Sequence, residues 1–509
     1  MRSDRYLLSL RVFGVISVWQ GHAFRALEHR PLRLASVALA ALLLIGTPGA
    51  ARAGGARVSA DGNGFTHGFH SAPSLQPPIV FVSGRDPDPQ YGDIFTDAQN
   101  SIQAGPVILN PEGQLVWFDP LPDGRFASDV TVQSYQGQSV LTYWQGYGGA
   151  LPAGEGVILN HSYQTVAVVH PGSGYVADNH EFTITPQGTA LISAYQIIPA
   201  NLSSVGGPRQ GKLIDSTIQE IDIATGEVLW QWQAYGHVPL SDSYAGKPGT
   251  GPYDAFHLDS IQQLPDGNLL VSARHTWTVY EINKQTGAIL WELGGKHSSF
   301  KFGPGAHFEW QHDARMQPDS TITLLDNGAG PGSQHERQSR ALRLRLDFKT
   351  HRATLIKAYT NDPSLLSSSQ GNIQTLPDRK VFVGWGTVPN FTEFSASGRQ
   401  LFSISFHSPL QAYRAFRLNW WGQPTASPDI AAAATRQGTD VYASWNGDTE
   451  VHAWRVLAGA SPTGLKPVGR FAKANFETKM PVHSTQPYFA VQALGGRGQV
   501  LGTSADAKR

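Results

Sequence analysis

The sequence predicts an all-β protein, a six-bladed β-propeller followed by a small C-terminal β-sandwich of the fibronectin III or immunoglobulin-like type. Three observations support this fold class. Glycine (54) and proline (33) are abundant among the 509 residues, while charged residues make up only 15%, which excludes coiled coils and charged disordered chains. A hairpin pattern recurs with a period of roughly 50 to 60 residues, and such a repeat is typical of β-propeller sequences. The pattern stops after Trp420 and Trp421.

The repeat consists of two hairpins per unit. One kind of hairpin has a Gly-containing turn and often carries Leu-Trp in its second strand. Its six copies cover 105–119, 164–177, 216–232, 277–293, 341–359 and 390–406. A second hairpin precedes most of them, at 129–144, 180–195, 257–273, 312–325 and 372–386. Two hairpins make one four-stranded blade. Two stacked β-sandwiches would also fit the strands, but they do not fit the regular period.

Ring closure needs a partner for the single strand at 413–418. We expect residues 78–83 at the N-terminal end to pair with it, because a closed ring hides the edges that an open sheet exposes. The predicted propeller therefore spans 75–421. A Pro-containing linker, 423–428, leads to short alternating strands over 429–505, which predict the sandwich.

The N-terminus has the pattern of a secretory signal peptide over residues 1–53. Arg30 and Arg33 flank an apolar stretch at 32–45, and Ala51-Arg52-Ala53 provides a cleavage site. The apolar stretch is too short to span a bilayer, which needs about 20 residues. We expect a secreted or periplasmic protein with no membrane span after cleavage; an uncleaved anchor is the alternative.

Composition excludes several classes of function. The chain has no cysteine, so disulfides, thiolate metal sites and a cysteine nucleophile are all excluded. Lys plus Arg and Asp plus Glu both number 39, which disfavours a nucleic-acid partner. The P-loop, G-x-S-x-G and H-E-x-x-H motifs do not occur. The sequence leaves the oligomeric state open.

Three histidines occupy the same position in their repeats. His180 lies eight residues before the turn residue Gly188, His257 ten before Gly267, and His312 eight before Ser320. Even offsets keep side chains on one face of a strand. Because inner strands of a propeller begin near the mouth of the central channel, we expect these imidazoles to converge there.

Cationic side chains lie near these histidines in the sequence. The candidates for substrate binding are His180, Arg274, His275, Arg315, Arg340 and Arg414, with Asp254, Asp259 and Asp313 as supporting carboxylates and Trp310, Trp277, Phe256 and Tyr253 as an aromatic wall. Imidazole and guanidinium groups together suit an oxyanion whose charge is held while a bond to it changes. Clustered histidines also suit a divalent metal, but the nearby arginines repel a cation. We therefore predict no metal and no cofactor.

Several stretches resemble the arylsulfotransferase family. They are DAFHLDSIQQLPDGNLLVSARHTWTVYEINKQTGAILWELGG at 254–295, WQHDAR at 310–315, LLDNGA at 324–329, SQGNIQTLP at 369–377 and YRAFRL at 413–418. The resemblance implies a six-bladed propeller outside the cytoplasm that moves a sulfuryl group from an aryl sulfate to a phenol without a nucleotide sulfate donor. In the bacterial enzymes the transfer passes through a sulfated histidine.

Individual residues carry this resemblance unequally. His257 and His312 match the active-site histidines of the family, and Arg274 with His275 matches its S-x-R-H element. Arg337 or Arg340 must replace another family arginine, and the later blade that holds the bacterial nucleophile has SQGN, GWG and QAYRA without a histidine.

We predict a mechanism in which Arg274 and Arg340 bind the sulfate oxygens. Of His257 and His312, one accepts the sulfuryl group or deprotonates the acceptor phenol, and the other protonates the leaving phenoxide.

Two other classes of function remain open at this stage. Quinoprotein dehydrogenases also carry T-G-x-x-L-W, as at 225–230 and 286–291, but they usually have eight blades. A secreted, non-enzymatic propeller that binds glycan or protein is the second alternative.

Overall fold

The structure, a computed structural model, describes residues 67–86, 91–122, 124–149, 151–330 and 333–509. Within these ranges the chain is built from β-strands, and its helical residues are confined to three single 3₁₀ turns, η1 (Ser203–Val205), η2 (Leu240–Asp242) and η3 (Pro462–Gly464). The predicted all-β fold class is confirmed. The predicted signal peptide lies outside the described residues. No helix in the described ranges has the length and apolar character needed to cross a membrane.

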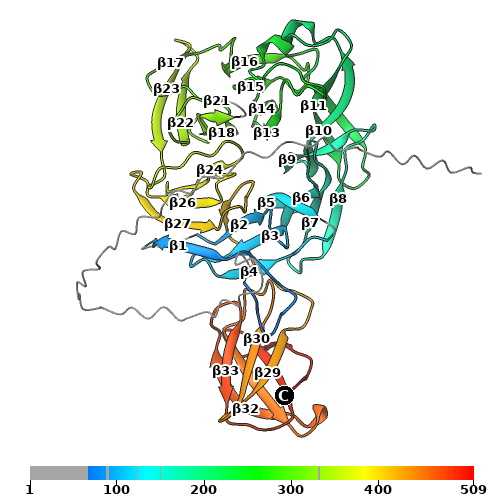
Figure 1. Ribbon diagram of the computed structural model, residues 1–509, viewed down its shortest axis with the longest axis vertical. Helices are drawn as coiled ribbons and strands as arrows, with labels where there is room; N and C mark the ends of the chain where they lie inside the picture. The colour runs from blue at the N-terminus through cyan, green and yellow to red at the C-terminus, as the bar shows by residue number, and fades with distance from the viewer. Residues whose placement is uncertain (1–66, 87–90, 123, 150, 331–332) are drawn as a thin grey trace, which may run out of the picture. The chain divides into compact units, whose positions relative to one another are not determined.

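Antiparallel sets of four strands follow one another along the chain from residue 93 (Figure 1). Set 1 contains β2 (Asp93–Ala98), β3 (Gly105–Leu109) and β4 (Leu115–Phe118), with β28 (Phe416–Leu418) beside β2. Set 2 contains β5 (Arg125–Tyr135), β6 (Gln138–Tyr147), β7 (Ala153–Leu159) and β8 (Thr165–Val169). Set 3 contains β9 (Val176–Ile184), β10 (Thr189–Ala200), β11 (Gly211–Asp222) and β12 (Val228–Gln233). A bridge between Gly154 and Ala177 joins sets 2 and 3.

The remaining sets repeat this arrangement. Set 4 contains β13 (Leu258–Gln263), β14 (Leu269–Ala273), β15 (Thr278–Ile282) and β16 (Ile289–Gly294). Set 5 contains β18 (His312–Met316), β19 (Thr321–Asp326), β22 (Arg340–Asp347) and β23 (Arg352–Tyr359), with β17 (Lys301–Phe302) beside β23 and a small ladder of β20 (Ala329–Gly330) and β21 (Ser333–Gln334) before β22. Set 6 contains β24 (Asn372–Thr375), β25 (Val381–Gly384), β26 (Asn390–Phe394) and β27 (Gln400–Phe406), with β1 (Val80–Gly84) beside β27.

The predicted pairing of residues 78–83 with 413–418 is wrong. Strand β1 pairs with β27 at the outer edge of set 6, whereas β28 pairs with β2 in set 1. The side chains of β1 are mostly exposed, which suits an edge strand, while Arg417 in β28 is only 2% exposed and needs an interior position. The first and last strands of the six sets, β2 and β28, therefore meet in set 1 rather than in set 6.

The first strands of sets 2 to 6 contact one another in order, and β28 of set 1 completes the cycle against β5 and against the second strand of set 6. Strand β5 packs against β9, β9 against β13, β13 against β18, β18 against β24, and β28 against both β5 and β25. Apolar side chains fill the space between neighbouring sets, as where Leu270 and Val279 of set 4 meet Ala314, Ile322 and Leu324 of set 5. Each fully buried leucine, isoleucine or valine among them stabilises the fold by about 1.5–3 kcal/mol.

Three glutamines on first strands connect each strand to the next set. Gln133 accepts from the Ile184 N–H at 2.7 Å and donates to the Phe182 carbonyl at 2.8 Å. Gln262 pairs in the same way with both main-chain groups of Met316, and Gln374 with both groups of Arg417. Because a primary amide matches one donor and one acceptor of a strand, these contacts fix the register between sets.

The last part of the chain forms two further sheets. One contains β29 (Asp429–Thr435), β30 (Gly438–Ser444) and β33 (Thr478–Val482), and the other contains β31 (Ala453–Gly459), β32 (Lys466–Ala472), β34 (Tyr488–Leu494), β35 (Val500–Thr503) and β36 (Ala507–Lys508). Their shared core includes Trp454, Met480 and Phe489. Residues near the start of the described chain bind here, since the Ser71 hydroxyl donates to Glu477 at 2.7 Å.

Candidate active site

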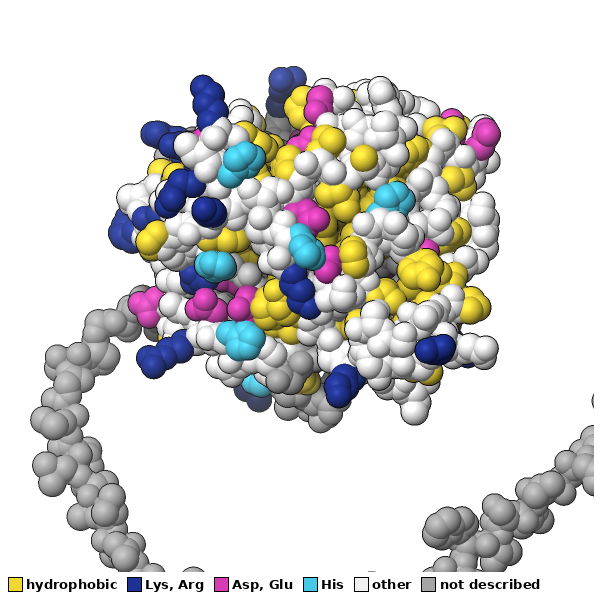
Figure 2. Space-filling view, turned by 90° about the horizontal axis from the view of Figure 1, so that it is seen from above, with side chains coloured by type: hydrophobic (Ala, Val, Ile, Leu, Met, Phe, Trp, Pro, Cys, Tyr) yellow, Lys and Arg dark blue, Asp and Glu magenta, His cyan; other side chains and the backbone are white. Residues whose placement is uncertain are grey.

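The structure brings three imidazoles together. His180 lies in β9, His257 directly precedes β13, and His275 follows β14. The ring centroids of His180 and His257 are 4.8 Å apart, and those of His257 and His275 are 4.5 Å apart. Figure 2 shows a face of the molecule where histidine, acidic and basic side chains lie near one another among hydrophobic ones.

His257 is oriented by Asp254. The Asp254 Oδ2 atom lies 2.5 Å from Nδ1 of the imidazole, and Oδ1 accepts the His257 backbone N–H at 3.0 Å. This turn holds His257 in a left-handed conformation with φ of 56°. Burial opposes ionisation of Asp254, but the adjacent imidazoles of His257 and His275 outweigh it and hold the pKa of this carboxyl below its usual value. The contact fixes Nδ1 as the protonated atom and leaves Nε2 as the reactive one.

Arg274 lies beside these rings. Its Nη1 donates to His275 Nε2 at 3.2 Å and its Nη2 to the Ser368 carbonyl at 2.9 Å. The side chain is buried, and its guanidinium carbon lies 5.0 Å from the centre of the Trp310 ring. Its Nε has no hydrogen-bond partner within the described ranges. Among the described residues no ion pair involves it. Burial lowers the pKa of Arg274 to about 10, so it stays cationic at neutral pH.

His275 and His180 differ in charge. Burial lowers the pKa of His275 to about 4, and its Nδ1–H donates to the Asp254 carbonyl at 2.8 Å, so this imidazole is neutral. Burial also lowers the pKa of His180, but Asp178, whose Oδ2 lies 2.7 Å from Nδ1, outweighs burial and raises it above 6.5. Of these two imidazoles, His180 is therefore the one that can donate a proton.

His312 is fully buried and both of its ring nitrogens are occupied. Its Nδ1 lies 2.7 Å from Asn327 Oδ1, and its Nε2 accepts the Gln370 backbone N–H at 3.0 Å. Burial and the nearby Arg274 charge lower its pKa well below 6.5. A role as nucleophile or base would therefore require one of these hydrogen bonds to break.

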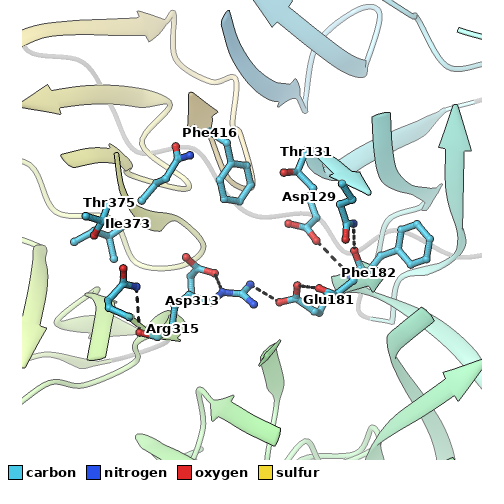
Figure 3. Close-up of a pocket in the computed structure, with 13 residues that line it drawn as sticks. Asp129, Thr131, Glu181, Phe182, Asp313, Arg315, Ile373, Thr375 and Phe416 are labelled. Atoms are coloured by element: carbon cyan, nitrogen blue, oxygen red, sulfur yellow. Dashed lines mark hydrogen bonds and ion pairs between the residues drawn. The ribbon is translucent and has the colours of Figure 1, made fainter. Parts of the chain in front are cut away.

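The other predicted arginines bind carboxylates. Arg315 lies between Asp313 and Glu181, at 2.7 and 2.6 Å, beside a cavity of about 330 Å³ (Figure 3). Arg414 is completely buried and binds Glu181 at 3.1 Å and Asp129 at 2.9 Å. These ion pairs neutralise both guanidinium groups.

Arg340 has a similar set of partners. It binds Asp326 at 2.5 Å and Glu336 at 3.0 Å, and it also donates to the Gly305 and His307 carbonyls. The positive charge of Arg340 is therefore committed to the fold. Of the four arginines predicted to bind substrate, Arg274 is the one that forms no ion pair in the described part of the chain. Arg337, the alternative to Arg340, is exposed.

Two of the four predicted wall aromatics lie at the site. Trp310 is edge-on to His275, with 5.8 Å between ring centres, and edge-on to Trp277 at 5.5 Å. Like Arg274 Nε, their buried Nε1 atoms have no hydrogen-bond partner among the residues that the structure describes. The other two, Phe256 and Tyr253, belong to hydrophobic clusters of the core.

A family model described as arylsulfotransferase (ASST) matches residues 131–407, more than half of the chain. The chain belongs to the arylsulfotransferase family. The matched range contains the three neighbouring imidazoles, Asp254, Arg274 and the buried His312. This arylsulfotransferase-family chain has no match among the curated proteins.

Solved structures share only low similarity with this arylsulfotransferase-family chain. A protein of unknown function from Bacteroides caccae is 13% identical, with a TM-score of 0.40 over 64% of this chain and 98% of that chain. An auxiliary nutrient binding protein from Bacteroides ovatus is 10% identical, with a TM-score of 0.33 over 70% and 74%. Virginiamycin B lyase from Staphylococcus aureus is 10% identical, with a TM-score of 0.28 over 82% and 96%.

The cluster also contains a possible metal-binding group. Asp254, His257 and His275 each offer one ligand atom, and these atoms lie within 4.8 Å of one another. The guanidinium of Arg274, which contacts His275, opposes a cation at this point. The negative charge of Asp254, in the same cluster, interacts with Arg274 and partly offsets its positive charge.

Sequence reasoning missed Asp178 and the roles of Asn327 and Gln370. The sequence contains a weak signal for the role of Asp178, because an acidic residue two positions before a histidine in a strand can reach the imidazole ring. Asn327 lies in LLDNGA and Gln370 in SQGN, but nothing in these motifs shows that both residues contact His312.

Proposed function

We propose that this protein transfers a sulfuryl group from an aryl sulfate to a phenol at the His180, His257 and His275 cluster, without a nucleotide sulfate donor. The observation that carries the proposal is the buried Arg274, which forms no ion pair within the described part of the chain and whose Nε is unpaired there. Asp254 and Asp259 favour its charged form but do not bind it directly. A buried charge is costly unless it is paired, and a sulfate ester supplies the oxygens that a guanidinium binds best. Family membership supports the same reaction.

In the first half of the reaction, Arg274 binds the oxygens of the sulfuryl group. The Nε2 lone pair of His257 attacks sulfur, so that an N–S bond forms while the S–O bond to the aryl group breaks. Asp254 stabilises the positive charge that develops on the ring. The phenoxide leaves with the bonding electron pair and takes a proton from His180, whose pKa Asp178 raises.

In the second half, the acceptor phenol returns a proton to neutral His180. Its oxygen attacks sulfur, the S–O bond forms, and the electron pair of the N–S bond returns to Nε2 of His257. We assign these proton and sulfuryl transfers to His180 and His257 rather than to His312, because both nitrogens of His312 are already hydrogen-bonded. For the same reason Arg274 acts without Arg340, which binds Asp326.

The architecture and location of the protein belong to this proposal. The cycle of first-strand contacts supports a six-bladed propeller over 75–421, and the two C-terminal sheets support a sandwich domain over 429–505. Export directed by residues 1–53 would place the protein where nucleotide donors are scarce, which suits a donor that is itself an aryl ester.

The test is incubation of the purified protein with 4-nitrophenyl sulfate and phenol. We expect release of 4-nitrophenol together with formation of phenyl sulfate, and mass spectrometry of protein quenched with donor alone should show an added sulfuryl mass on His257. The matched control is His170→Ala, which replaces an exposed histidine. If wild-type protein and the His257→Ala variant form phenyl sulfate at the same rate, the proposal is wrong.

A further inference from the structure

The turn at residues 367–371, between β23 and β24, contains a strained glutamine. Gln370 has φ of 66° and the following Gly371 has φ of 98°. Left-handed backbone is unfavourable for a residue with a side chain, and such strain persists only where the surroundings enforce it. Strained residues of this kind cluster at functional sites.

Two buried side chains clamp this glutamine. The Gln370 N–H donates to His312 Nε2 at 3.0 Å, and the Gln370 carbonyl accepts from Asn327 Nδ2 at 3.1 Å. His312 and Asn327 also bind each other at 2.7 Å. The pair therefore holds both peptide groups of Gln370.

Neighbouring backbone encloses the turn from the other side. A Cβ atom on Gly386 would lie 2.3 Å from the Ser369 carbonyl oxygen and 2.5 Å from the Gln370 carbonyl carbon, so a side chain there does not fit. The Gly371 N–H donates to the Tyr413 carbonyl at 2.8 Å. The turn has little freedom to relax.

This rigid turn joins the candidate active site. The Ser368 carbonyl accepts from Arg274 at 2.9 Å. Two residues later the Gln370 Oε1 atom is buried, and no described residue forms a hydrogen bond with it. Leaving a buried acceptor unsatisfied costs about 1–3 kcal/mol. An amide oxygen repels sulfate oxygens and needs a hydrogen-bond donor as its partner.

We infer that Gln370 is a specificity-determining residue that selects acceptor phenols with a second hydroxyl group, and that His312 and Asn327 are its positioning residues. This inference rests on the proposed function. The first hydroxyl of the acceptor gives its proton to His180 and attacks sulfur, while the second donates to Gln370 Oε1. A buried polar group discriminates strongly against an analogue that leaves it unpaired.

The experiment compares catechol, resorcinol and hydroquinone with their monomethyl ethers as acceptors of the sulfuryl group from 4-nitrophenyl sulfate. In each ether the second hydroxyl can no longer donate. For at least one pair, we expect wild-type protein to show a ratio of kcat/KM of tenfold or more in favour of the diol. Gln370→Ala and Gln370→Gly should both bring that ratio close to one; the glycine variant accepts the left-handed backbone without strain, so it isolates the loss of the side chain.

Gln136→Ala is the matched control, because Gln136 is an exposed glutamine that also has a left-handed φ, 51°. It should keep the wild-type ratio. The His312→Ala variant should lose the preference, as the Gln370→Ala variant does, because the substitution releases the backbone of Gln370. Wild-type protein without a preference for any diol, or a preference unchanged in both Gln370 variants, overturns the inference.

Failure of the proposed function can be distinguished from failure of this inference about Gln370. If no aryl sulfate is turned over, calorimetric binding of the same diols and ethers to wild-type protein and to Gln370→Ala decides the inference separately. A diol preference of tenfold or more in binding that Gln370→Ala removes supports the subsite, while equal binding of diol and ether, or no binding of either, contradicts it.

Discussion

The Nδ1 atom of His257 lies 2.5 Å from Oδ2 of Asp254, while Oδ1 of the same carboxylate accepts the His257 backbone N–H. One side chain thus fixes both the ring tautomer and the left-handed backbone of the residue that carries the ring. An imidazole held in this way presents Nε2 as a nucleophile of defined direction.

Replacing Asp254 by asparagine should lower kcat for transfer from 4-nitrophenyl sulfate by about 10²- to 10⁴-fold, because the amide no longer fixes the tautomer or stabilises the positive ring. Steady-state kinetics on folded protein measure the effect. Asp506→Asn, at an exposed position, is the control and should match wild type. A near-normal kcat for Asp254→Asn would remove His257 from its proposed role.

Replacing Arg274 by lysine should raise KM for the donor about tenfold or more. An ammonium keeps the charge but lacks the Nε donor and the planar geometry that bind two oxygens of one anion. Arg209→Lys changes an exposed arginine in the same way and should have no effect. An unchanged KM in Arg274→Lys would show that the sulfuryl group binds elsewhere.

The rate should fall on the alkaline side as His180 loses its proton. Asp178 raises the pKa of His180 above 6.5, so protonated His180 persists to a higher pH than a free imidazole would. Asp178→Asn removes the charge that favours the protonated ring, and the alkaline limb of the kcat profile should move to lower pH. A limb that stays in place would assign the proton donor to another group.

The glutamine contacts between sets should contribute to stability. Gln262→Leu leaves the N–H and carbonyl of Met316 without their partners, which costs about 1–3 kcal/mol. Urea unfolding should show a lower midpoint. Gln187→Leu, in an exposed turn, is the control. Equal midpoints for the two variants would show that solvent satisfies Met316 equally well.

Chelation should leave the activity unchanged. The proposed steps use only imidazole, carboxylate and guanidinium groups, and Arg274 repels a cation from Asp254, His257 and His275. Protein dialysed against EDTA should keep its kcat within about twofold. Activity lost on dialysis and restored by Zn²⁺ would mean that these three residues form a catalytic metal site.

Part of this protein could be predicted from local pattern. Strand propensity, turn residues and a constant period depend on neighbours in the sequence, so the all-β class followed from them. The even offsets of His180 and His257 from their turns also placed both rings on matching faces, and the structure puts them 4.8 Å apart. The family resemblance, which depends on motifs, is confirmed by the match over 131–407.

Contacts between distant segments decided the rest. The sequence could not show that 413–418 pairs with β2 rather than with 78–83, because either strand can satisfy an open edge. Nor could it separate Arg274 from Arg414, since only folding gives Arg414 its carboxylate partners and leaves Arg274 without one. Local pattern determines which elements form, but the charge and reactivity of a side chain depend on the neighbours that packing brings to it.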